Sequence, residues 1–310
     1  MKLLFREENY ENYGKCIVLS NGTVEIYVSL DIGPRVLRYG FIGGENVFFN
    51  DLKREVVNND LSINKTFGQP GWNIYGGHRL WTSPEYMPET YYPDCYPVEF
   101  IKTEQGGIFN QVEQLPFKKK CSIEFVLGED TNITVIHRVT NTGTTQSEYA
   151  IWALSVLAPG GTEIIPMPRR KTGYLANRVI SVWDYVDMSD DRVYWGKDYI
   201  TLKQDPAAES SFKFGINNDV AVSGYFNKGL CFIKHYDHHE NGVYPDYGVS
   251  YETYTNAKFL EAETLGELKK VAPGETISHN EYWSLVKTDI SFDHKNEAET
   301  AKAAAIFLQK

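Results

Sequence analysis

The hydrophobic residues of this chain lie in short runs that are rich in β-branched and aromatic side chains. Runs of this kind, closed by turn residues, are typical of β-strands. Turn signals such as Asn21-Gly22, Gly160-Gly161 and Asn241-Gly242 separate them, as expected between antiparallel strands. The strands predicted in this way are residues 16–19, 24–30, 122–127, 133–139, 148–157, 220–226, 231–235, 250–255, 259–264 and 277–285.

One helix is predicted against this β pattern, near the end of the chain. Residues 296–308 combine an asparagine that can cap a helix with alanines and glutamates, which favour helices. The segment Asp51–Gly71 is polar and rich in asparagine, so we expect a long loop there. Since no βαβ alternation, repeat or flexible linker is visible, the pattern predicts one all-β domain over residues 1–310.

The composition is that of a globular protein and excludes several kinds of partner. Hydrophobic residues make up 42% and charged residues 23% of the chain, which is enough to bury a core. The net charge of −10 argues against nucleic acid, whose binding needs clustered lysine and arginine. No run approaches the roughly 18 apolar residues of a membrane helix, and no secretory signal is apparent. We therefore expect a cytoplasmic protein that binds neither membrane nor nucleic acid.

The cysteines and histidines do not form a recognisable metal motif. Cys16, Cys95, Cys121 and Cys231 lie far apart without C-x-x-C spacing, so we expect reduced thiols and no disulfide. The segment 235–240 (HYDHHE) contains three histidines, but its spacing fits no standard zinc pattern. The sequence therefore predicts no metal and no cofactor.

The densest group of chemically useful residues is the segment 75–85 (YGGHRLWTSPE). It contains His78, Arg79, Trp81 and Glu85 beside two glycines, which can let the backbone approach a ligand closely. Arg79 offers a forked set of donors to hydroxyls or anions. The alternative is a purely structural pairing of Arg79 with Glu85.

Two glutamates in a late predicted strand form the second candidate. Glu261 and Glu263 are two positions apart, so on a strand they point to one face. Close carboxylates raise the pKa of one another, which prepares a general base for proton transfer. A solvent-facing acidic strand is the alternative. His137, among apolar neighbours, is expected to be a core histidine.

Four segments together resemble the galactose mutarotase-like superfamily, which includes aldose 1-epimerases. They are 33–38 (GPRVLR), 76–81 (GGHRLW), 244–256 (YPDYGVSYETYTN) and 259–266 (FLEAETLG), the last leading into 272–275 (APGE). The resemblance spans most of the chain. It implies a β-supersandwich of large twisted antiparallel sheets, which the short C-terminal helix predicted above completes, and an open cleft for a small carbohydrate.

The resemblance also implies roles for individual residues. Arg79 resembles the substrate-binding arginine of the epimerases, and either Glu261 or Glu263 matches their catalytic base. The epimerases also carry a mid-chain histidine that protonates the ring oxygen, but the matching strand 149–157 has none. His78 or His235 could replace it, because an imidazole titrates near neutrality.

Two functions follow from these expectations. The first is an aldose or sugar-derivative 1-epimerase that opens the sugar ring by Glu/His acid–base catalysis. The second is a carbohydrate-binding protein of the same fold without catalysis, in which tryptophans provide apolar platforms. The residues predicted to contact the sugar in either case are Arg79, Trp81, Glu85, Trp152, Lys213, Tyr244 and Asp246, together with Trp72 as a further platform.

Overall fold

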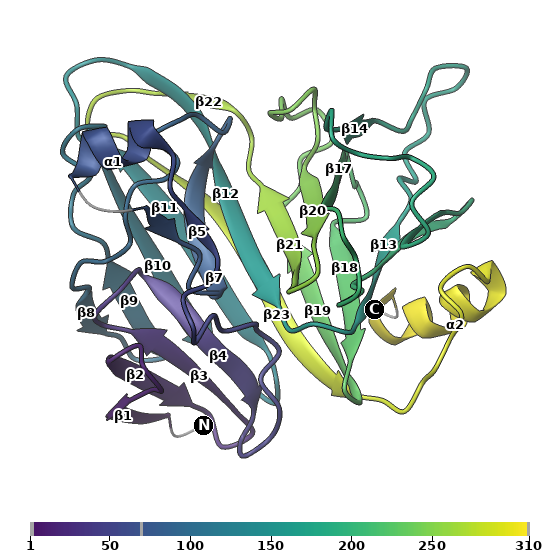
Figure 1. The fold of residues 1–310 in the computed structure, drawn as a ribbon, viewed down its shortest axis with the longest axis horizontal. Helices are drawn as coiled ribbons and strands as arrows, with labels where there is room; N and C mark the ends of the chain where they lie inside the picture. The colour runs from purple at the N-terminus through teal and green to yellow at the C-terminus, as the bar shows by residue number, and fades with distance from the viewer. Residues whose placement is uncertain (1–2, 69–70, 309–310) are drawn as a thin grey trace.

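The computed structural model describes residues 3–68 and 71–308, and two large antiparallel sheets make up most of it (Figure 1). The first sheet has eleven strands, in the order β1 (Leu4–Asn9), β2 (Lys15–Ser20), β3 (Val24–Ser29), β4 (Arg35–Phe41), β7 (Gly77–Ser83), β12 (Ser147–Leu157), β21 (Leu260–Leu265), β20 (Tyr251–Thr255), β17 (Phe212–Ile216) and β14 (Ile180–Val182), with β22 (Lys269–Val271) paired to β12.

The second sheet has ten strands, and a third sheet has only two. The second sheet runs in the order β15 (Val193–Trp195), β16 (Tyr199–Lys203), β13 (Thr162–Pro166), β18 (Val222–Asn227), β19 (Leu230–Tyr236), β23 (Thr276–Lys287), β11 (Ile133–Asn141), β10 (Lys119–Leu127), β9 (Gly106–Asn110) and β8 (Glu99–Lys102), and the small sheet pairs β5 (Val57–Asn58) with β6 (Trp72–Asn73). The all-β prediction is therefore confirmed.

The main core lies between the two large sheets. Strand β11 alternates buried and half-buried residues along its length, as expected when one face of a strand packs inward. Trp283 of β23 lies at the centre of this core, where its ring contacts Tyr39 and Phe48 from the side of the first sheet. Each strand that the hydrophobic pattern predicted overlaps one observed strand, in chain order β2, β3, β10, β11, β12, β18, β19, β20, β21 and β23.

The C-terminal helix forms where it was expected, as α2 (Glu297–Leu308). It packs against β18 and β16 beside the second sheet, at the right of Figure 1. Ala303, Ala304 and Phe307 contribute to a small core with Ile164 and Val222. Gly224 is needed in this contact, because a β-carbon there would lie 2.5 Å from the Phe307 ring.

The segment expected to be a long loop contains a short helix and a strand. Helix α1 (Leu61–Phe67) begins after Asp60, whose carboxylate accepts a hydrogen bond from the backbone N–H of Ser62. It ends at Gly68, in the left-handed conformation that glycine adopts without strain. Residues 69 and 70 of this segment lie outside the described residues. The prediction of a loop was thus wrong for α1 and β5.

The glycine pair of segment 75–85 has a structural role that differs from the expected one. Both glycines have positive φ, and a β-carbon would lie 2.1 Å from the carbonyl oxygen of Phe49 at Gly76 and 2.0 Å from that of Val36 at Gly77. The close approach is therefore to the protein's own backbone. Gly77 is also the first residue of β7, a central strand of the first sheet.

Two further features concern the covalent structure and the helices. None of the four cysteines, all within the described residues, forms a disulfide. Neither helix of the described chain is long and apolar enough to cross a membrane.

Candidate functional site

A cleft of about 680 Å³ opens on the outer face of the first sheet. Its floor is formed by β7, β12, β21, β20 and β17, and segments from other parts of the chain form its rim. The lining residues are Val56, Val57, Asn58, Trp72, Ile74, Arg79, Trp81, Glu85, Tyr91, Trp152, Leu154, Trp183, Tyr185, Ser210, Ser211, Lys213, Tyr254, Asn256, Phe259, Glu261 and Glu263.

Strand alternation and register bring the distant residues of this floor together. Arg79 and Trp81 occupy alternate positions of β7, and Glu261 and Glu263 occupy alternate positions of β21, so each pair points to one face. Leu154 of β12 pairs with both Arg79 and Glu263, which places these two residues in one row across three strands. The floor therefore combines segments that are more than 180 residues apart in the chain.

Arg79 is held in the cleft by one carboxylate and two indole rings. Its Nη1 donates a 2.9 Å hydrogen bond to Oε1 of Glu261, and both side chains are almost fully buried. The guanidinium lies 4.4 Å from the ring centre of Trp81 and 5.4 Å from that of Trp72, within cation–π range. Its Nε has no hydrogen-bond partner among the described residues. Arg79 is thus pre-positioned with a donor still to be satisfied.

Glu263 is the most buried acid of the cleft lining. Its Oε2 accepts a 2.8 Å hydrogen bond from Nε1 of Trp152 and lies 3.3 Å from Nζ of Lys213. Its Oε1 has no partner among the described residues. Burial raises the pKa of Glu263; the Lys213 charge opposes this rise and Glu261 adds to it.

Lys213 links Glu263 to a further glutamate on the neighbouring strand. Its Nζ lies 2.8 Å from Oε2 of Glu252, and its charged end lies 4.7 Å from the Trp152 ring and 4.5 Å from the Trp183 ring. Burial alone would lower the pKa of Lys213, but the two carboxylates outweigh it, and the pKa is raised well above its ordinary value. Lys213 is therefore charged and fixed between carboxylates and aromatic rings.

The rim supplies polar and aromatic groups that are more accessible. Glu85 does not pair with Arg79; its Oε1 accepts a 2.5 Å hydrogen bond from the Tyr91 hydroxyl. Tyr185 is 48% exposed, and Trp183 beside it is half-buried. An open cleft with aromatic faces and a few fixed charged groups suits a small polar molecule with apolar ring faces.

His78 does not line this cleft. It lies on β7 between Gly77 and Arg79 and points to the opposite face, where it is fully buried between the sheets. Burial and the neighbouring His137 lower the pKa of His78 well below its ordinary value. The structure thus separates His78 from the two glutamates of β21.

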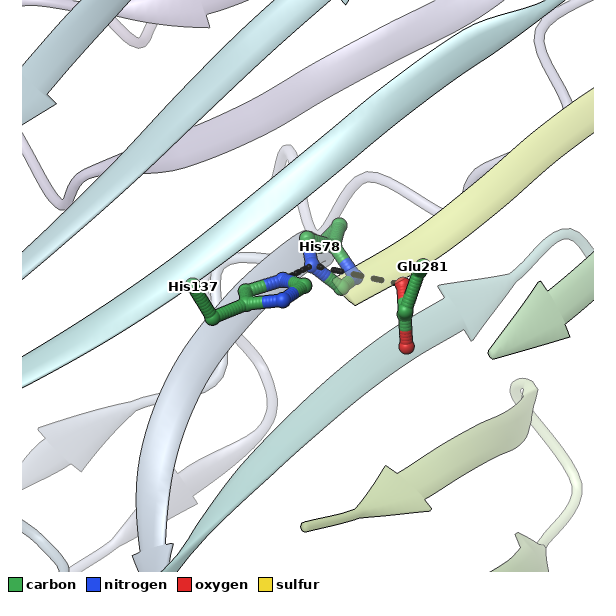
Figure 2. A group of neighbouring side chains, drawn as sticks. All are labelled: His78, His137 and Glu281. Atoms are coloured by element: carbon green, nitrogen blue, oxygen red, sulfur yellow. Dashed lines mark hydrogen bonds and ion pairs between the residues drawn. The ribbon is translucent and has the colours of Figure 1, made fainter. Parts of the chain in front are cut away.

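Two buried histidines, His78 and His137, are joined by a hydrogen bond (Figure 2), and each also bonds a further residue. Nδ1 of His137 faces the carbonyl oxygen of His279, which only accepts, so this nitrogen carries the proton. Nε2 of His137 then accepts a 2.7 Å hydrogen bond from Nε2–H of His78, and Nδ1 of His78 accepts one from the Ser155 hydroxyl. Burial lowers the pKa of His137 to about 3, in agreement with neutral rings.

Glu281 lies beside these histidines, and one ligand atom from each of the three side chains lies within 4.8 Å of the others (Figure 2). Two imidazole nitrogens on one tetrahedral zinc ion lie about 3.3 Å apart, so the 2.7 Å separation is that of a hydrogen bond. The carboxylate of Glu281 is already engaged by Lys234, Thr264 and Trp283. The candidate ligand atoms of His78, His137 and Glu281 are therefore already occupied by contacts within the protein.

Buried polar groups between the two sheets also hold β21, the strand that carries Glu261 and Glu263 in the cleft floor. Nζ of Lys234 donates a 2.9 Å hydrogen bond to the carbonyl oxygen of Ala262, the residue between Glu261 and Glu263. Thr264, on the same inner face of β21, donates to Glu281. Polar contacts from the second sheet thus fix the strand that carries both glutamates.

Three other predicted residues lie away from the cleft lining. His235 is exposed on β19 of the second sheet, where it pairs with Val222 and Tyr282. Tyr244 is buried, and its hydroxyl accepts a hydrogen bond from the backbone N–H of His239. Asp246 accepts a 3.1 Å hydrogen bond from the Ser83 hydroxyl. The structure brings together Arg79, Trp81, Glu85, Trp152, Lys213, Glu261 and Glu263.

Sequence reasoning missed Glu252, Tyr254, Trp183 and Tyr185. Glu252 and Tyr254 alternate along β20 in the same way as Glu261 and Glu263 along β21, so the period-two pattern of the strand 250–255 could have revealed them. Trp183 and Tyr185 lie beyond β14 in an irregular segment, and no local pattern indicates their position at the rim.

Comparison of whole structures identifies the fold. No protein-family profile and no curated protein matches the sequence. The structure is similar to a galactose mutarotase-like protein from Lactobacillus casei ATCC 334 (10% identity, 87% of this chain and 100% of that one, TM-score 0.53). It is also similar to a galactose mutarotase-like protein from Clostridium acetobutylicum (11%, 92% and 99%, 0.51) and to the Slr1438 protein from Synechocystis sp. PCC 6803 (13%, 93% and 97%, 0.55). The chain has the galactose mutarotase-like fold.

Proposed function

We propose that the cleft binds a small carbohydrate. The observation that carries the proposal is the combination, in one open cleft, of aromatic rings with an arginine–glutamate pair and a partnerless carboxylate oxygen. Sugar rings have apolar faces that stack on aromatic side chains, and hydroxyls that need both donors and acceptors. Exposed Tyr185 and half-buried Trp183 provide aromatic rings, Arg79 provides donors and Glu263 provides an acceptor.

A second candidate function, 1-epimerisation of an aldose, is favoured by the state of Glu263. Ring opening needs a base at the anomeric hydroxyl, and a base works best when its pKa is raised towards neutrality. Burial raises the pKa of Glu263, whereas Oε1 of Glu261 is engaged by Arg79. The reaction also needs an acid at the ring oxygen, and no histidine is found among the described residues that line the cleft. We therefore rank binding before catalysis.

The location that fits this function is the cytoplasm. The cysteines support it, since Cys16, Cys121 and Cys231 are buried and no disulfide joins the described residues. The proposed partner is a small-molecule carbohydrate, and the proposed chemistry needs no cofactor.

Calorimetry and polarimetry on the same samples test both functions. The purified protein is titrated with neutral aldoses, amino sugars, uronic acids and sugar phosphates, and each binder is then followed by polarimetry from one pure anomer. Binding of at least one sugar supports the first function, whereas no heat from any member of the panel contradicts it. Anomer equilibration faster than in buffer supports the second function.

Matched variants then assign the base. Glu263→Gln should abolish any catalysed equilibration more completely than Glu261→Gln, because burial raises the pKa of Glu263, whereas Arg79 binds Oε1 of Glu261. Glu129→Gln, at an exposed residue that does not line the cleft, serves as the control. If a bound sugar equilibrates at the buffer rate in the presence of the wild-type protein, the epimerase assignment fails and the binding assignment stands.

A further inference from the structure

Two facing glutamates and one lysine lie together at the cleft, and two of the three, Glu263 and Lys213, line it. Glu252 of β20 and Glu263 of β21 are direct cross-strand partners, a position in which β-carbons are about 5 Å apart. Each is only 1% exposed. Nζ of Lys213 lies 2.8 Å from Oε2 of Glu252 and 3.3 Å from Oε2 of Glu263.

We propose that Glu252 and Glu263 hold a single proton between them beside Lys213, and that Glu252 is a positioning residue that sets the protonation of Glu263. The proposal deepens the function given above, because Glu263 is the acceptor assigned there. Glu252 itself is absent from the cleft lining, so it acts through Glu263 and Lys213.

The charge balance of the three groups supports the shared proton. One ammonium group offsets one carboxylate, and a second ionised carboxylate would remain as an uncompensated buried charge, which is costly. Oε1 of Glu252 and Oε1 of Glu263 accept no hydrogen bond from the described residues, so neither charge is relieved in that way. A proton on one carboxyl group makes the trio neutral.

The surrounding charges do not supply the missing compensation. Two further cations, Arg79 and Lys234, act on Glu263, but Arg79 is paired with Glu261, and Nζ of Lys234 lies 2.8 Å from Oε1 of Glu281. The other charged groups that influence the trio are Glu85, Asp246 and Glu261, and these are acidic. Burial is the main cause of a raised pKa at both Glu252 and Glu263, and Lys213 only partly opposes it.

Carbon-13 NMR of protein labelled at the glutamate carboxyl carbons can observe this proton directly. The spectra are recorded from about pH 5 to about pH 9, well above the ordinary glutamate pKa of about 4.3. Glu163 also titrates in this range, so the measurements use a Glu163→Gln background. We expect a titration above the ordinary range that is lost in both Glu252→Gln and Glu263→Gln.

The pKa of the glutamate that remains in each variant shows whether Glu252 and Glu263 influence one another. In Glu252→Gln, Lys213 has one carboxylate to neutralise, so the pKa of Glu263 should fall by about one unit or more. Glu252→Asp should restore a raised pKa, and Glu261→Gln should leave the shared titration in place. Circular dichroism confirms that each variant is folded.

Two results would overturn the proposal. In one, Glu263 titrates at the same pH in the wild type and in Glu252→Gln. In the other, both carboxyl groups are already ionised at about pH 5 in the wild type. Neither result depends on a sugar. If the protein binds no sugar of the panel but the shared titration is observed, the proposed function fails and the shared proton stands.

Discussion

Replacing Glu163 by glutamine should remove a large part of the pH dependence of stability near neutrality. Glu163 lies on β13 with no exposed surface. The Tyr251 hydroxyl donates a hydrogen bond to its Oε1, while Oε2 has no partner among the described residues. Burial raises the pKa of Glu163 to about 7, despite the opposing hydrogen bonds and the charge of Lys234.

The sign of the effect follows from where the proton is bound. Between the ordinary pKa of 4.5 and about 7, the folded protein keeps a proton on Glu163 that the unfolded chain has lost. The free energy of unfolding therefore falls as the pH rises through this window. One pKa unit corresponds to about 1.4 kcal/mol, so the penalty is about 3 kcal/mol once the pH exceeds 7. Glutamine has nearly the same shape and no charge, so it avoids this penalty.

Urea denaturation at several pH values measures the difference. Wild type and Glu163→Gln should have similar free energies of unfolding near pH 5, and the variant should be more stable by about 2 to 3 kcal/mol near pH 8. Exposed Glu129→Gln is the matched control and should follow the wild type at every pH. Parallel curves for wild type and Glu163→Gln would refute the reasoning, since they would mean that Glu163 titrates alike in both states.

Four other outcomes are expected. Trp183→Ala should weaken sugar binding in calorimetry about five- to thirty-fold through loss of about 1 to 2 kcal/mol of ring stacking; an unchanged Kd would remove Trp183 from the site. His78→Gln should lower the free energy of unfolding by about 1 to 3 kcal/mol, since it disrupts two buried hydrogen bonds, and should leave the sugar Kd within about two-fold; a normal Kd with all catalysis lost would instead restore His78 as the acid. Dialysis against a chelator should not change Tm, because the core histidines and Glu281 already bind one another or other residues; a large fall in Tm would reveal a structural metal. Thiol titration of the denatured, unreduced protein should count all four cysteines, and a lower count would indicate a disulfide.

The strands were predictable where their own residues carry the pattern. Strand β11 has a buried residue at every second position, and β12 is a long apolar run. Strand β7 was not predicted, because Gly77, His78 and Arg79 at its start suggest a loop. Its pairing with β12 and β4 makes it a strand, and such pairing depends on residues distant in sequence.

The sequence predicted which residue types form the site, but it predicted less well which side chains point into the cleft. The spacing of Glu261 and Glu263 correctly indicates a shared face. Adjacent His78 and Arg79 are equally suited to a site by residue type, but on β7 only one of them can face the cleft. Which one does is decided by the other sheet, since His137 and Ser155 receive the His78 ring. The residues near position 78 in the sequence do not indicate these partners, which are distant in the chain.

The alternation along β21 also bears on how such a protein can diversify. Residues 261 and 263 line the cleft, whereas residues 262 and 264 belong to the contacts between the sheets. Substitutions in the first set can alter which molecule is accepted without touching the packing that the second set maintains. Such a strand can therefore change the residues that line the cleft during evolution or in redesign. The residues that pack between the sheets can stay the same, because the two kinds of residue alternate along the strand.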